Sequence, residues 1–128
     1  MPENLPRPTD AELEILTVLW SLGPSTVGEV HKVISRRKPS QYSTVLKFMQ
    51  IMTNKGLVRR NEEQRAHVYE AARPREWTQR QLAGDLLSRA FNGSATSLMV
   101  GALSARRASK DELADLRKLL DEYEKRTR

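Results

Sequence analysis

Apolar positions in the first part of the chain repeat at the spacing of an α-helix. Residues 13–22 are apolar on nearly every side of such a helix, which predicts a central helix packed on two or more sides. Thr9 and Glu12 have the spacing of a capping box, in which each side chain accepts a hydrogen bond from the other residue's backbone N–H. The helix is therefore expected to begin after Thr9 and to end at Gly23-Pro24.

A second capping box, formed by Thr26 and Glu29, opens another helix after a short connection. Pro39-Ser40 is expected to end it. A third helix is predicted from about Gln41 to Asn54, closed by the basic last turn and glycine of Lys55-Gly56.

The third helix has one apolar and one polar face. Its inward stripe is formed by Val45, Phe48, Met49 and Met52. The positions left to point outward are Ser43, Thr44, Lys47, Gln50 and Asn54. This outward face is short, polar and uncharged apart from Lys47.

Two short β-prone runs, residues 57–60 and 65–71, flank a polar turn at residues 61–64 and predict a hairpin. The order of three helices followed by a hairpin is that of a winged helix-turn-helix. The predicted fold is mainly α with a small β-hairpin wing. A winged-helix DNA-binding domain is expected over residues 1–74.

Residues 75–128 are predicted to form a helical dimerisation region. Helices are expected over about 75–91 and 95–103, and a last one from the Ser109–Glu112 capping box. These helices carry more apolar surface than they can hide among themselves, so a second copy of the chain is the expected cover. The alternative is that they complete a monomeric core. The expected dimerisation residues are Leu86, Phe91, Leu98, Met99, Leu103, Leu113, Leu116, Leu120 and Tyr123.

Charge is distributed unevenly along the chain, whose net charge is +6. The 32 residues between Glu29 and Glu62 contain eight Lys and Arg and no acidic residue, which is a concentrated electrostatic footprint for a polyanion. The third predicted helix lies inside this window. The pattern therefore favours DNA as the partner.

In a winged helix, the third helix enters the major groove, where small polar side chains can approach base edges. Ser43, Thr44 and Lys47 are predicted to do so. Most of the affinity must come from phosphate contacts by Lys and Arg. The candidates for these contacts are Arg36, Arg37, Lys38, Lys55, Arg59, Arg60 and Arg65.

Two observations allow a different interpretation of the third helix and the wing. A polar outer face can be an ordinary solvated face, and Glu62 and Glu63 at the expected wing tip would repel phosphates. The tip is therefore expected to face away from DNA or hardly to touch it. The alternative function is a winged-helix protein-binding adaptor without DNA recognition. Ile51 is the one strong apolar candidate for such a surface on the third helix.

Several motifs resemble the penicillinase-repressor family of winged-helix transcriptional regulators, which includes the β-lactamase and methicillin-resistance repressors. Their order and spacing cover nearly the whole chain. The matching segments are residues 13–16 with Leu19-Trp20, residues 42–45, 54–58, 65–69 and 91–94, and Ser97-Leu98.

The resemblance implies a sequence-specific transcriptional repressor that binds a palindromic operator as a homodimer. Tyr42, in the motif that opens the third helix, completes the expected base-reading set of Tyr42, Ser43, Thr44 and Lys47. In some members a membrane sensor protease relieves repression by cleaving an Asn-Phe bond. That bond is not matched near Gly101-Ala102, which leaves the release mechanism open. Copper-responsive relatives carry a C-terminal cysteine cluster, and this chain has no cysteine.

The sequence gives no support to an enzyme. His31 and His67 are isolated from each other in the predicted fold, and no phosphate-binding glycine loop, HExxH motif or nucleophile elbow is present. No catalytic residue, metal site or cofactor is expected. The absence of cysteines, of a secretory h-region and of an apolar run long enough to span a bilayer favours a cytoplasmic protein without membrane insertion.

Overall fold

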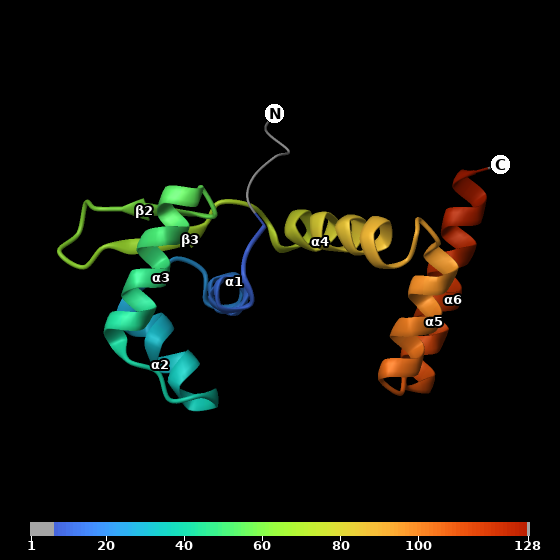
Figure 1. Cartoon of the computed structure of the whole chain (residues 1–128), viewed down its shortest axis with the longest axis horizontal. Helices are drawn as coiled ribbons and strands as arrows, with labels where there is room; N and C mark the ends of the chain where they lie inside the picture. The colour runs from blue at the N-terminus through green and yellow to red at the C-terminus, as the bar shows by residue number, and fades with distance from the viewer. Residues whose placement is uncertain (1–6, 128) are drawn as a thin grey trace. The chain divides into compact units, whose positions relative to one another are not determined.

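The computed structural model describes residues 7–127, which form two compact units. The first unit ends at Leu82 and the second begins at Ala83, so the division falls inside a helix. The elements of the first unit are α1 (Asp10–Leu22), β1 (Ser25–Thr26), α2 (Val27–Arg37), α3 (Tyr42–Lys55), β2 (Val58–Asn61) and β3 (Val68–Ala71) (Figure 1). The remaining helices are α4 (Arg75–Ala90), which crosses the division, α5 (Ala95–Ala105) and α6 (Lys110–Arg126). This order confirms the predicted winged helix-turn-helix.

The first two helices begin at the predicted capping boxes. Thr9 Oγ1 accepts a hydrogen bond from the Glu12 N–H at 3.2 Å, and Glu12 Oε1 accepts one from the Thr9 N–H at 2.9 Å. The same two bonds join Thr26 and Glu29, at 3.2 and 2.9 Å. Each box satisfies two backbone donors that a helix start leaves without a partner, so both starts are fixed by local sequence.

The end of α3 is also fixed locally. Gly56 has a φ of +81° in the left-handed region, where a Cβ atom would be strained. The chain reverses there, and the Leu57 N–H donates to the Met52 carbonyl at 2.9 Å. The predicted glycine stop is confirmed.

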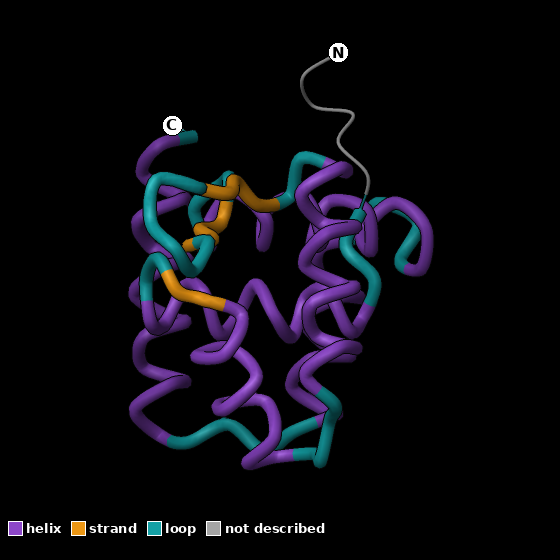
Figure 2. Tube along the Cα trace, turned by 90° about the vertical axis from the view of Figure 1, so that its left-hand side faces the viewer, coloured by secondary structure: helices purple, strands orange, loops and turns teal. Residues whose placement is uncertain are grey.

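The sheet has three antiparallel strands in the order β1-β3-β2. Figure 2 colours the strand segments orange. β1 was not predicted, because residues 23–26 read as a connection between two helices. In the structure Ser25 pairs with Tyr69 and Thr26 with Val68. The pairing joins the start of α2 to the wing.

The wing differs from the prediction at its second strand. β3 begins at Val68, so Arg65, expected in a strand, lies in the loop between β2 and β3. Asn61 Oδ1 accepts a hydrogen bond from the Glu63 N–H at 2.9 Å, and this local turn directs the chain away from the strand pairing of β2 with β3. The loop is longer than the predicted four-residue turn for this reason.

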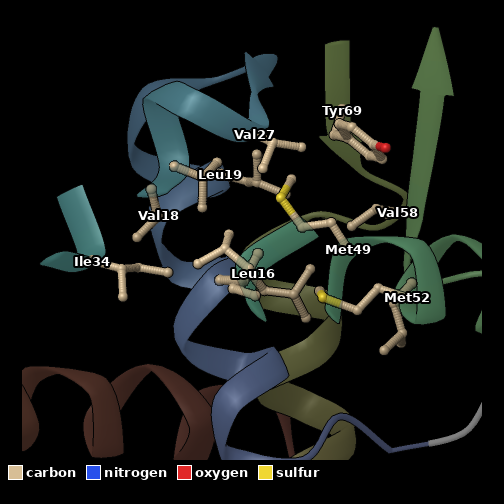
Figure 3. Close-up of a cluster of buried hydrophobic side chains, with 13 residues drawn as sticks. Leu16, Val18, Leu19, Val27, Ile34, Met49, Met52, Val58 and Tyr69 are labelled. Carbon is tan, nitrogen blue, oxygen red and sulfur yellow. The ribbon is translucent and has the colours of Figure 1, made fainter. Parts of the chain in front are cut away.

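One hydrophobic core holds the first unit together, and it is drawn in Figure 3. Tyr69 from β3 is 1% exposed and closes the side of the core that faces the sheet. The other buried members are Ile15, Leu16, Val18, Leu19, Val27, Val30, Ile34, Val45, Met49, Met52, Leu57 and Val58. Because α1, α2, α3 and the sheet all contribute, the core fixes the orientation of α3.

Trp20 ties the segment after β3 to α1. Its Nε1–H donates to the Arg73 carbonyl at 3.0 Å, and the Arg73 guanidinium lies 5.0 Å from the centre of the Trp77 ring in α4. The first turns of α4 therefore lie in the first unit, which ends at Leu82.

The second unit has no buried side chain among residues 83–127. Its helices nevertheless have defined starts: Ser94 Oγ accepts from the Ser97 N–H at 3.1 Å, and Ser109 Oγ from the Glu112 N–H at 3.0 Å. None of the helices in the described range is long and apolar enough to cross a membrane.

Candidate nucleic-acid interface

α3 turns a polar face to solvent because its opposite face is anchored in the core. Met49 and Met52 are 0% exposed. Ser43, Thr44 and Lys47 are all exposed. The predicted orientation of this helix is confirmed, and three of the four expected base-reading residues share one accessible face.

Tyr42, the fourth, is the first residue of α3 and is 51% exposed. The residue before it, Gln41, caps the helix without a side-chain hydrogen bond. The first turn of α3 therefore presents the positive end of the helix dipole without a neutralising acidic side chain. An anion is favoured at such an end.

The turn between α2 and α3 is held by His31, which is not among the predicted site residues. His31 Nε2 lies 2.6 Å from the Ser40 carbonyl oxygen, and its ring meets that of Tyr42 edge-on with centroids 5.9 Å apart. No local pattern pointed to this role, because the partners are nine and eleven residues away along the chain.

A basic cluster lies beside the start of α3. Arg36 and Arg37 form the last turn of α2, and Lys38 follows as its cap, with its N–H donating to the Ile34 carbonyl at 3.0 Å. All three side chains are exposed. They occupy the helix end where positive charge is also favoured by the dipole.

The wing carries cations that are partly offset by its own acids. Arg60 Nη2 lies 3.0 Å from Glu62 Oε1, and Arg59 Nε lies 3.9 Å from Glu70 Oε1. Arg59 also donates to the Ala72 carbonyl at 3.2 Å. Arg59 and Arg60 therefore add less net positive charge to the wing than their number suggests.

A groove of about 200 Å³ separates α3 from the wing. Tyr42 and Leu46 line it from α3, and Arg65 and His67 line it from the wing loop. The structure thus brings Tyr42 and Arg65 together at one concave surface, although they are far apart in sequence. His67 joins them there and was not among the predicted site residues.

Lys55 has a different partner from the one expected. Its Nζ lies 3.0 and 2.9 Å from the two carboxylate oxygens of Glu12, whose side chain is 2% exposed. Burial alone would raise the pKa of Glu12, but the hydrogen bond from the Thr9 N–H and the Lys55 ammonium outweigh it and lower that pKa. Lys55 is engaged in holding α3 to α1, and we do not include it among the phosphate contacts.

Comparison with known proteins decides the family. Residues 8–122 match the family described as penicillinase repressor. The chain belongs to this family. The resemblance seen in the sequence motifs is thereby confirmed across almost the whole chain.

Relatives of this penicillinase-repressor chain include the transcriptional regulator BlaI of two strains of Mycobacterium tuberculosis, each 34% identical over 94% of this chain and 88% of the relative. The penicillinase repressor of Bacillus licheniformis is 25% identical over 97% of both chains. These relatives are regulators and repressors, and the family is not an enzyme family, as the sequence predicted.

A solved structure resembles this family member in fold. It is the solution structure of the monomeric form of Bacillus licheniformis BlaI in complex with the blaP half-operator. The match has a TM-score of 0.51 and 26% sequence identity, and it covers 58% of this chain and 90% of the other. It supports the winged-helix assignment.

The predicted dimerisation residues of this penicillinase-repressor chain lie on α4, α5, α6 and the segment after α4. The exposed ones are Leu86 (47%), Met99 (39%), Leu103 (41%), Leu120 (67%) and Tyr123 (54%). The half-buried ones are Phe91, Leu98, Leu113 and Leu116. Val100 and Leu119, which are 60% and 47% exposed, add to this apolar surface.

Proposed function

We propose that this chain is a sequence-specific transcriptional repressor that binds a palindromic operator as a homodimer. The observation that carries the proposal is the exposed, acid-free polar face of α3 beside the cations of α2. Two relatives are named as a transcriptional regulator and a penicillinase repressor, and a similar fold has been solved on operator DNA. Family, fold and surface chemistry support the same partner.

Base reading is assigned to Tyr42, Ser43, Thr44 and Lys47 on α3. Ser and Thr hydroxyls both donate and accept hydrogen bonds, and the Lys47 ammonium can donate to the O6 and N7 acceptors of guanine. The helix presents these groups from a backbone fixed by the buried residues of its opposite face. Such rigidity is what discrimination between base pairs requires.

Phosphate contacts are assigned to the cations that flank α3. Arg36, Arg37 and Lys38 have exposed side chains and no acidic partner among the ion pairs of the described residues. Arg65 contributes from the groove beside Tyr42. Arg59 and Arg60 contribute less to the net charge, because Glu70 and Glu62 lie next to them. Affinity from these contacts falls as salt rises, since bound counterions are released from DNA.

The homodimer is proposed because the second unit cannot cover its own apolar side chains. None of its residues from 83 to 127 is buried, while Leu103, Leu120 and Tyr123 are more than 40% exposed. A second copy of the same surface can cover them by two-fold symmetry. The two reading helices of such a dimer would contact half-sites about 34–36 Å apart, one turn of DNA.

Two narrower points complete the proposal. A repressor acts where the DNA is, and we place this one in the cytoplasm. We leave cleavage by a membrane sensor protease out of the proposal, because Gly101-Ala102 in α5 does not match the Asn-Phe bond of the penicillinase branch.

The test is a titration of the purified chain against its own promoter and a scrambled duplex of equal length, at two salt concentrations. Tight, salt-sensitive binding to the promoter by a dimer, measured by gel shift and sedimentation, is the expected result. Equal weak binding to both duplexes would contradict the proposal and favour a protein-binding adaptor. Lys110→Ala, at the start of α6, serves as the charge-matched control for lysine substitutions in α3.

A further inference from the structure

The carbonyl that precedes the cap of α3 is held by side chains of α2. His31 Nε2 lies 2.6 Å from the Ser40 carbonyl oxygen, and Ser35 Oγ donates to the same oxygen at 3.3 Å. A carbonyl only accepts hydrogen bonds, so His31 carries a proton on Nε2. Ser40 is directly followed by Gln41, the cap of α3.

The start of α3 lacks a side-chain cap. The caps of α1, α2, α5 and α6 each accept a hydrogen bond through their own Ser or Thr side chain, but Gln41 makes none. The start of α3 is therefore oriented from α2, across the turn, rather than by its own cap residue. Of the two contacts to the Ser40 carbonyl oxygen, that of His31 is shorter than that of Ser35, so we expect His31 to contribute more to the orientation of the turn.

His31 also contacts the first residue of α3 directly. Its ring meets the Tyr42 ring at an interplanar angle of 79° with 5.9 Å between centroids, an edge-to-face geometry that aromatic rings favour. Tyr42 is 51% exposed, so about half of its surface is open to solvent. His31 itself is half-buried and lies outside the core cluster.

We propose that His31 is a positioning residue for DNA reading: it sets the first turn of α3 and the direction of the Tyr42 ring without contacting DNA. The inference rests on the proposed function, since it assigns a role relative to operator binding. An imidazole suits this place because one side chain supplies both a hydrogen-bond donor for the turn and a ring for Tyr42. Glutamine retains only the donor and phenylalanine only the ring.

The test is a double-mutant cycle with His31→Ala and Tyr42→Ala, measuring affinity for the promoter and for a scrambled duplex. His31→Ala is expected to weaken promoter binding about tenfold, or about 1.4 kcal/mol, and to leave scrambled binding unchanged. In the Tyr42→Ala background the same change should cost clearly less, because the ring it positions is absent. An equal cost in both backgrounds, or an equal loss on both duplexes, would overturn the proposal.

Three further variants separate the contacts made by His31 and Ser35. His31→Gln and His31→Phe should each lose less promoter affinity than His31→Ala, while Ser35→Ala, which removes only the longer bond, should lose the least. Thermal unfolding of each variant shows whether the fold is retained, and the ring-proton shifts of Tyr42 report its orientation by NMR. Promoter binding by the unmodified chain is the separate test of the proposed function, so failure of the two is distinguishable.

Discussion

The Lys55 ammonium, in the last turn of α3, forms an ion pair with both carboxylate oxygens of Glu12, in the first turn of α1. The same carboxylate accepts the Thr9 N–H and closes the capping box of α1. One buried side chain thus fixes the start of one helix and the end of another. Because α3 carries the proposed reading face, this pair contributes to its orientation.

Neutralising Glu12 is expected to reduce stability and its dependence on pH. The folded-state pKa of Glu12 lies below the ordinary value of 4.5, so its carboxylate stabilises the fold above about that pH and the contribution is lost as pH falls through the folded pKa. Glu12→Gln keeps the cap and removes the ion pair, at a cost of about 1–3 kcal/mol near pH 7. Urea unfolding from pH 7 to pH 3 measures this cost, which should shrink on acidification.

For the Glu12 substitution, Glu14→Gln is the control on the same helix. Identical pH profiles of the Glu12 variant and the unmodified chain would contradict the expectation.

Removing a base-reading side chain should reduce specificity. Thr44→Ala and Lys47→Ala are each expected to weaken promoter binding by about 1–3 kcal/mol while leaving scrambled-duplex binding nearly unchanged, because lost base-edge contacts affect only the cognate sequence. Gel-shift titration on both duplexes measures the difference. Lys110→Ala controls for the loss of one positive charge, and losses of the same size on the two duplexes would contradict the assignment.

Removing a phosphate contact should weaken binding to both duplexes instead of reducing specificity. Arg37→Ala is expected to weaken binding to promoter and scrambled duplexes by similar factors and to reduce the slope of log affinity against log salt by about one. Affinities at four or more salt concentrations give this slope. Arg89→Ala in α4, where Arg89 already pairs with Asp85 at 3.5 Å, should leave the slope unchanged. A loss confined to the promoter would mean that Arg37 reads bases instead.

A charge on the apolar face of α6 should prevent dimerisation. Leu120→Asp or Leu116→Asp places an unpaired carboxylate in the proposed interface, where burial without a partner is costly. Sedimentation velocity should show monomers, and promoter affinity should fall because only one half-site is bound at a time. Ala114→Asp adds the same charge on the other side of the helix and should stay dimeric. A dimer that persists in both leucine variants would contradict this interface.

Local sequence by itself determined the starts of α1 and α2, the end of α3 and the two faces of α3. The Thr9–Glu12 box and the left-handed Gly56 involve residues within a few positions of one another, so their geometry follows from the local sequence. The spacing of Val45, Met49 and Met52 likewise placed Thr44 and Lys47 on the opposite, exposed side.

Tertiary structure decided the contacts between residues far apart in the chain. The pairing of Ser25 with Tyr69, the ion pair of Glu12 with Lys55 and the bond from His31 to Ser40 leave no periodic trace in the sequence. Each exists because packing around one core brings its partners together, and the energy of such a contact depends on burial and geometry that residue type and local spacing do not specify. Sequence therefore predicted which face of α3 is available, and the fold determined what holds that face in place.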